Sequence, residues 1–194
     1  MKLARVLELG RSVRVLGLDD GPFTKAPGAA VPVCGVVCRD TRFEGMLWGR
    51  VRRDGFGATR EVLRLVGGSK FLPQVHLVLL DGLAFGGFNL VDLPALAEGL
   101  GVPCAAVCRR MPDLAAMERA LGGLTQPARR LRLLRRAGAL YEHPPWVFQV
   151  AGEGPAVVAR ALARLTDTGH VPECLRLAHL VAAAVRLGES NRRA

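Results

Sequence analysis

The chain has 194 residues, of which 50% are hydrophobic and 23% charged, and its formal net charge at pH 7 is +10. This composition fits one globular domain with a sizeable core and excludes an intrinsically disordered chain. The apolar runs have strand length, about 5–9 residues, so they are too short to span a bilayer, and no signal-peptide pattern is present; a cytoplasmic protein without membrane contact is expected.

The predicted elements begin with strands only and then alternate between strands and helices. Strands are expected at 13–19, 31–39, 43–52, 75–81, 103–109 and 146–151, and helices at 58–66, 90–100, 113–121, 127–140, 155–165 and 173–187. The short turn at 39–42 predicts an antiparallel hairpin. This order indicates one α/β domain, 1–194: a mixed sheet with an antiparallel N-terminal meander and helices on both faces. That arrangement is ribonuclease H-like, because a Rossmann fold would alternate from its first strand.

Two of the apolar strands end in a carboxylate followed by glycine. Asp19-Asp20-Gly21 closes the first strand and Asp81-Gly82 closes the fourth. The carboxyl ends of buried strands form the edge of an α/β sheet where ligands bind, and Mg²⁺ takes one or two carboxylates in proteins. Asp19 and Asp81 are therefore candidate metal ligands, although each could instead be a turn residue that bonds its own backbone. Asp20 points away from Asp19 if strand alternation continues, so one of the two is expected to be structural.

The five cysteines favour neither a zinc site nor a disulfide. Cys34 and Cys38 fall in one predicted strand, and Cys104 and Cys108 fall in another. Four residues along a strand span roughly 13 Å, which is too far for a shared zinc ion or a disulfide. We expect buried, reduced cysteines, which suits a reducing compartment.

Arginine supplies nearly all of the positive charge, since lysine occurs at only three positions. Arginine binds phosphate through two parallel hydrogen bonds, so nucleic acid is a natural partner. Residues 127–136 form an expected amphipathic basic helix, with Leu131 and Leu134 on its apolar face. The alternative is an ordinary solvated surface. The candidate nucleic-acid-binding residues are Arg109, Arg110, Arg129, Arg132, Arg136 and Arg176.

Three motifs together carry a family resemblance over nearly the whole chain. They are 17–23 (GLDDGPF), 80–89 (LDGLAFGGFN) and 169–179 (GHVPECLRLAH). They resemble the domain-of-unknown-function family 99, an uncharacterised and mostly archaeal family. That family is distantly similar to endonuclease V, a ribonuclease H-like, Mg²⁺-dependent nuclease that cuts near deaminated purines.

The similarity to endonuclease V implies roles for individual residues. The Gly-x-Asp and Asp-Gly motifs of that enzyme match Asp19 and Asp81, and its Arg-Glu pair matches Arg60-Glu61. This implies that Glu61 is a third metal ligand and a catalytic residue. The alternative for Glu61 is a first-turn residue that favours the helix dipole.

The C-terminal helix matches the endonuclease V pattern at four positions and departs from it at two. Pro172, Glu173, Arg176 and Ala178 match, whereas Cys174 and His179 depart. His179 stands where a carboxylate is expected, which makes it a candidate catalytic acid or base, or a metal ligand; a core or interface histidine is the alternative. The aromatic-proline wedge before the Arg-Glu pair has no counterpart here, and Phe85-Gly86 replaces the His-Pro after the Asp-Gly motif, so base specificity does not carry over.

The function expected from these observations is Mg²⁺- or Mn²⁺-dependent cleavage of DNA or RNA. One alternative is a non-catalytic nucleic-acid-binding protein that kept the ribonuclease H-like fold. Another is an interaction protein whose arginine-rich face binds an acidic partner.

Overall fold

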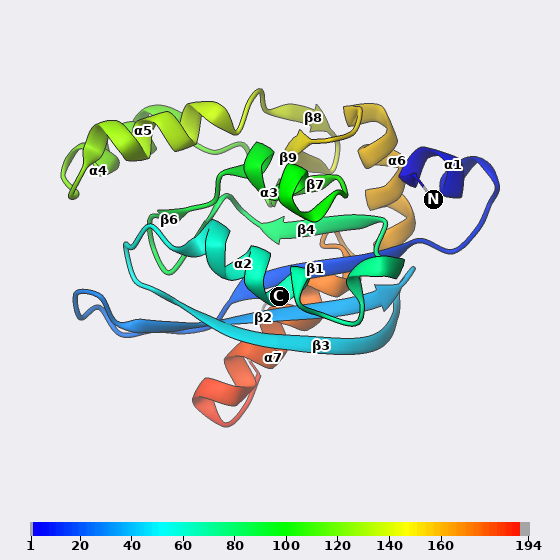
Figure 1. Ribbon diagram of the computed structural model, residues 1–194, viewed down its shortest axis with the longest axis horizontal. Coiled ribbons are helices and arrows are strands. Elements are labelled where there is room, and N and C mark those ends of the chain that lie inside the picture. The colour runs from blue at the N-terminus through cyan, green and yellow to red at the C-terminus, as the bar shows by residue number, and fades with distance from the viewer. Residues whose placement is uncertain (1, 191–194) are drawn as a thin grey trace.

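A seven-stranded mixed sheet forms the centre of the computed structural model, which describes residues 2–190 (Figure 1). The strand order is β3-β2-β1-β4-β7-β9-β8, and β1, β4 and β7 run parallel while the other pairings are antiparallel. A separate small hairpin consists of β5 and β6. The bounds are β1 Arg14–Asp20, β2 Ala30–Arg39, β3 Arg42–Arg52, β4 Leu77–Asp81, β5 Ala84–Phe85, β6 Asn89–Leu90, β7 Cys104–Cys108, β8 Tyr141–His143 and β9 Trp146–Ala151.

Helices cover both faces of the sheet (Figure 1). Strand alternation in β1 sends Leu16 and Leu18 to the core shared with α2 and α3, and sends Val15 to the core shared with α6 and α7. The helices are α1 Leu3–Glu8, α2 Ala58–Gly67, α3 Leu93–Leu100, α4 Leu114–Gly122, α5 Pro127–Arg136, α6 Pro155–Leu165 and α7 Glu173–Leu187, with a 3₁₀ turn at Leu72–Gln74.

Helix α7 lies directly against β1 because Gly17 lacks a side chain. A Cβ atom at Gly17 would lie 2.7 Å from Cys174 Sγ, and one at Gly21 would lie 2.9 Å from the Ala182 carbonyl oxygen. Eight residues of helix rise about 12 Å, and four residues of strand advance about 13 Å. The α7 segment from Cys174 to Ala182 and the β1 segment from Gly17 to Gly21 therefore have nearly the same length. Residues near the middle of the helix segment lie beside residues near the middle of the strand segment.

The structure confirms the predicted fold, including the 39–42 hairpin turn and the helices on both faces. The expected helix at 127–140 ends at Arg136, and the expected strand at 75–81 starts at Leu77 after the 3₁₀ turn. Helix α1 and strands β5, β6 and β8 were not predicted. They are two to six residues long, too short for a hydrophobic period to be visible.

The five cysteines are free, and all but Cys108 are buried, as the strand spacing predicts. Strands β2 and β7 are separated by β1 and β4, which keeps the two pairs apart. Among residues 2–190, no helix has the length and apolar character needed to cross a membrane.

Candidate metal centre

Asp19, Asp81 and His179 converge at the carboxyl edge of the sheet. One ligand atom from each side chain lies within 4.8 Å of the others. Asp19 is only 4% exposed, and its Oδ2 lies 2.9 Å from His179 Nδ1. The structure thus brings together the two strand-end carboxylates and the histidine that the sequence singled out.

The convergence follows from the strand pairing and the helix contact. Strands β1 and β4 are parallel neighbours with Leu18 opposite Leu80, so the next residues, Asp19 and Asp81, end their strands side by side. His179 lies on α7 between the two positions, Cys174 and Ala182, that pack against Gly17 and Gly21. The matched advance of the helix and the strand places it beside Asp19.

The surroundings of the carboxylates at this edge make the ionised form of Asp81 less favourable than it is in water. Burial raises the pKa of Asp81, and the neighbouring charge of Asp19 raises it further, while Arg109 lowers it. Arg109 donates a hydrogen bond to Asp81 Oδ2 at 3.2 Å, from a side chain that is 44% exposed. The hydrogen bond to Asp19 raises the pKa of His179, which favours the imidazolium form.

The same three groups fit a divalent cation. Carboxylate oxygens are the protein ligands that Mg²⁺ and Mn²⁺ prefer, and an imidazole nitrogen suits Mn²⁺ better than Mg²⁺. A bound cation would offset the charge that raises the pKa of Asp81. The donor set is thus compatible with a metal, with room for water or substrate on the ion.

Asp20 takes the other side of the strand, and its role differs from that of Asp19. Its Oδ2 accepts a hydrogen bond from the Gly86 N–H at 2.6 Å, which ties the end of β1 to the β5–β6 hairpin. Burial, with a smaller effect of Asp19, raises the pKa of Asp20 to about 6. The sequence expectation that one of the two aspartates is structural agrees with this placement.

Glu61 is not part of the cluster. It lies in the first turn of α2, and its carboxylate accepts hydrogen bonds from Arg64 at 2.7 and 3.0 Å and from the Arg50 N–H at 3.3 Å. Helix α2 packs on the face of the sheet opposite α7. The structure does not bring Glu61 together with Asp19 and Asp81 as the resemblance implies, and we leave it out of the metal centre.

The six candidate nucleic-acid-binding arginines differ in how they are engaged. Arg176 is paired with Glu173 at 2.6 Å and Arg136 with Asp92 at 3.1 Å, so both charges are compensated. Arg109 lies at the metal cluster itself, while Arg110 and Arg132 are exposed. The guanidinium of Arg129 lies over the ring of Phe56 at 4.4 Å from its centre.

The amphipathic character of α5 is confirmed, but one of its arginines is buried. Leu134 is buried and Leu131 packs against the core, whereas Arg130 is 1% exposed and donates hydrogen bonds to backbone carbonyl oxygens. Sequence reasoning missed this residue. Its position about 40° from Leu134 on the helical wheel, beside the apolar face, was the available signal, but a charged residue is normally assigned to solvent.

Comparison with known proteins gives the family. A family model described as endonuclease dU matches residues 11–186. A UPF0215 protein of Methanothermobacter thermautotrophicus is 38% identical over 189 residues, covering 95% of this chain and 93% of the relative. A UPF0215 protein of Deinococcus radiodurans is 39% identical over 185 residues, covering 93% and 92%.

Solved structures share the fold. A protein of unknown function from Archaeoglobus fulgidus has a TM-score of 0.85 at 31% identity, covering 89% of this chain and 98% of that one. Endonuclease V from Bacillus subtilis has a TM-score of 0.59 at 12% identity (89% and 80% covered). Endonuclease V from Ciona intestinalis, in complex with an inosine-containing DNA, has a TM-score of 0.56 at 15% identity (88% and 84% covered). The chain thus has an endonuclease V-like fold and belongs to the family described as endonuclease dU, whose members include the UPF0215 proteins.

Proposed function

We propose that this protein is a metal-dependent endonuclease that cuts a phosphodiester bond in DNA or RNA. The observation that carries the proposal is the convergence of Asp19, Asp81 and His179 within 4.8 Å at the carboxyl edge of the sheet. The endonuclease V-like fold, the family description and the net charge of +10 support it.

Each residue of the cluster has a distinct task in this proposal. Asp19 and Asp81 would hold Mg²⁺ or Mn²⁺ through carboxylate oxygens, and His179 would contribute a ring nitrogen once it has lost its proton. When bound, the ion lowers the pKa of a water molecule and offsets charge on the reacting phosphate. Arg109, half-exposed beside Asp81, binds a non-bridging oxygen of that phosphate and orients it.

The raised pKa values of His179 and Asp81 set the direction of the pH dependence. Both groups must lose their proton before they can bind a cation. Metal affinity is therefore expected to increase as pH rises through the elevated pKa values, and to be weak in acid.

The test is cleavage of end-labelled single- and double-stranded DNA and RNA in Mg²⁺, Mn²⁺ or a chelator. The set includes strands that contain uracil, because of the family description, and strands that contain inosine, because of the Ciona structure. Asp81→Asn is expected to reduce cutting at least about a hundredfold. Asp167→Asn, an exposed aspartate in the loop before α7, is the matched control and is expected to cut normally. Equal cutting by the wild type and Asp81→Asn would overturn the proposal.

A second candidate function is nucleic-acid binding without cleavage. It is favoured by one observation: Glu61 does not reach the cluster, which leaves two carboxylates and an imidazole where the resemblance implies a further carboxylate. This alternative predicts that a folded wild type binds strands in a salt-sensitive way, does not cut them, and keeps its affinity in Asp19→Asn or Asp81→Asn.

A further inference from the structure

A second charged feature lies at the β3 edge of the sheet, beside the start of α2 and apart from the metal centre. It is a cleft of about 760 Å³ bounded by the end of β3, the segment 55–57, the start of α2 and the start of α5. Four exposed arginines line it: Arg50, Arg52, Arg60 and Arg129.

The positive charge of this cleft is not compensated. Within residues 2–190, none of the four arginines forms an ion pair with a carboxylate, in contrast to Arg64, Arg136 and Arg176. The acidic side chain on its wall is Glu61, and Arg64 already holds both oxygens of that carboxylate at 2.7 and 3.0 Å. An anion is therefore the ligand that this cleft would attract.

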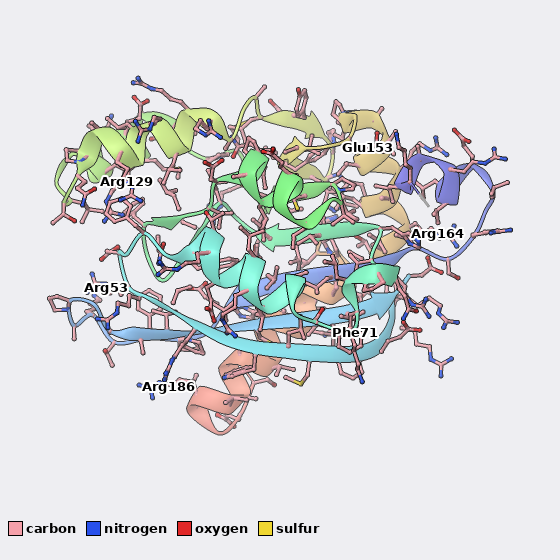
Figure 2. All side chains as sticks on the ribbon, viewed as in Figure 1. Arg53, Phe71, Arg129, Glu153, Arg164 and Arg186 are labelled. Carbon is pink, nitrogen blue, oxygen red and sulfur yellow. The ribbon has the colours of Figure 1, made fainter. Side chains whose placement is uncertain are left out.

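The walls are held in place before any ligand binds. Two guanidinium groups lie over the Phe56 ring, that of Arg129 at 4.4 Å and that of buried Arg130 at 4.2 Å from the ring centre. In Figure 2, Arg129 extends from α5 on the same side of the molecule as Arg53, which follows β3. An arginine fixed in this way loses less conformational entropy when it binds phosphate.

The start of α2 adds partial positive charge to the same cleft. Gly57 caps this ten-residue helix and provides no side-chain hydrogen bond to its first N–H groups. Gly57 and Arg60 both line the cleft, so the positive end of the helix dipole points toward it together with the guanidinium groups.

The cleft is joined rigidly to the metal centre. The Asn89 side chain donates to the Arg52 carbonyl oxygen at 2.9 Å and accepts from the Ala58 N–H at 3.0 Å. In the turn of the same β5–β6 hairpin, Gly86 donates to Asp20, next to Asp19. The hairpin that follows Asp81 therefore connects one wall of the cleft to the cluster, and both lie at the edge where β1 and β3 end.

We propose that this cleft binds the phosphodiester backbone of a single nucleic-acid strand whose continuation reaches the metal centre. The choice of nucleic acid rests on the proposed function. The cleft has the volume of a small-ligand site, which suits a few nucleotides of one strand better than a duplex. Four arginines along a concave surface match successive phosphates, which guanidinium groups bind through paired hydrogen bonds, and they read no base sequence.

The test compares two double variants that remove the same charge. Arg50→Ser with Arg52→Ser changes two exposed side chains of β3. The hydrogen bonds of these two residues to Glu61 and Asn89 are made by their main-chain groups, which the substitutions keep. Arg119→Ser with Arg160→Ser changes exposed arginines on α4 and α6, outside the cleft. Affinity for a fluorescein-labelled single strand of mixed sequence is measured by anisotropy at several salt concentrations, in a chelator that prevents cutting.

The cleft variant is expected to bind the strand at least about tenfold more weakly at low salt. Its plot of log affinity against log salt is expected to be shallower by about 1.4, since each contact with a single-strand phosphate contributes about 0.7. The control variant is expected to stay near the wild-type values. Equal losses in the two variants would overturn the proposal, and so would preferential binding of poly-glutamate or of duplex DNA.

The outcome is separable from that of the proposed nuclease. The cleft variant should keep wild-type Mn²⁺ affinity and melting temperature, whereas Asp81→Asn should keep strand binding and lose Mn²⁺. Strand binding that depends on the cleft in a protein that cuts nothing would sustain this inference and reject the nuclease. Cutting that depends on Asp81 with no effect of the cleft variant on binding would do the reverse.

Discussion

Arg130 and the aspartates at the ends of β1 and β4 are ionisable groups with little exposure to solvent. Their surroundings differ in how well they stabilise the charged form. Arg130 donates to the carbonyl oxygens of Thr125 at 2.9 Å and Phe88 at 2.7 Å, and also to those of Asp54 and Gly55. Asp19 and Asp81 instead lie next to each other, and burial together with their mutual repulsion raises the pKa of Asp81. The guanidinium of Arg130 is thus fully hydrogen-bonded, whereas the surroundings of Asp81 disfavour its ionised form.

The difference separates a structural charge from a functional one. A buried charge is tolerable when every donor has a partner, because only then is its lost hydration replaced. Arg130 satisfies that condition and links α5 to the 54–57 segment and the β5–β6 hairpin. Ionising Asp81 in its buried position costs free energy, which is the arrangement expected where a cation is to bind.

Replacing Arg130 should have the largest effect on stability. Arg130→Met removes the donors that bond four carbonyl oxygens from the buried guanidinium, so a loss of about 3–5 kcal/mol in unfolding free energy is expected. The measurement is urea denaturation followed by circular dichroism. Arg129→Met, the adjacent exposed residue, is the matched control and should lose less than about 1 kcal/mol. Similar losses of unfolding free energy in the two variants would show that the hydrogen bonds of Arg130 do not stabilise the packing of α5 on the 54–57 segment.

His179→Ala should weaken metal binding at least about tenfold, since the imidazole is both a candidate ligand and the hydrogen-bond partner of Asp19. Titration calorimetry with Mn²⁺ between pH 6 and 8 measures this effect. The wild type should bind more tightly as pH rises and His179 loses its proton, while the variant should show a flatter profile. A variant that keeps the wild-type pH profile would exclude His179 from the metal centre.

Asp20→Asn should stabilise the protein by about 1–2 kcal/mol at pH 8 in the absence of metal. The pKa of Asp20 is raised from its ordinary value of 3.8 to about 6, so the folded state holds that proton more tightly than the unfolded state. The stability that this proton contributes is complete below pH 3.8 and is lost as pH rises through about 6. Asparagine stays neutral and can still accept from Gly86.

The measurement for Asp20 is the difference in unfolding free energy between the wild type and Asp20→Asn at several pH values. The difference should be small near pH 4 and grow toward pH 8, and added Mn²⁺ should reduce it by favouring the ionised aspartate. If the unfolding free energies of the wild type and Asp20→Asn differed by the same amount at every pH in that range, the raised pKa of Asp20 would be contradicted.

The sequence was sufficient for the fold and for the strand-end carboxylates, for identifiable physical reasons. Buried strands leave continuous apolar runs, and a parallel pair necessarily brings its two carboxyl ends together, so Asp19 and Asp81 could be paired from their positions alone. The contact between Asp19 and His179 depends on how α7 crosses β1. It depends on the close packing of α7 at Gly17, where a Cβ atom would lie 2.7 Å from Cys174 Sγ, and no local sequence pattern indicates that packing.

What the sequence could not provide were interactions between distant segments. The buried Arg130 binds carbonyl oxygens 42 to 76 residues away, and the arginines of the cleft come from β3, α2 and α5. A charged residue in a helix pattern is assigned to solvent by default, and only the packing of α5 on the 54–57 segment removes it from water.

Glu61→Gln should have the smallest effect on stability and on metal binding. It extends the comparison of Arg130 with the aspartates to an acidic residue whose charge is paired with that of an arginine, Arg64. Its pairing with Arg64, a side chain that is 65% exposed, is worth no more than about 1 kcal/mol of stability. If Glu61 lies outside the metal centre, Mn²⁺ affinity should be unchanged in the variant. Strand binding should increase slightly, since the acidic charge on the wall of the cleft is removed and Arg64 is released. A tenfold loss of Mn²⁺ affinity would instead mean that α2 moves to bring Glu61 to the cluster when metal binds, because the structure without metal holds it on the opposite face of the sheet.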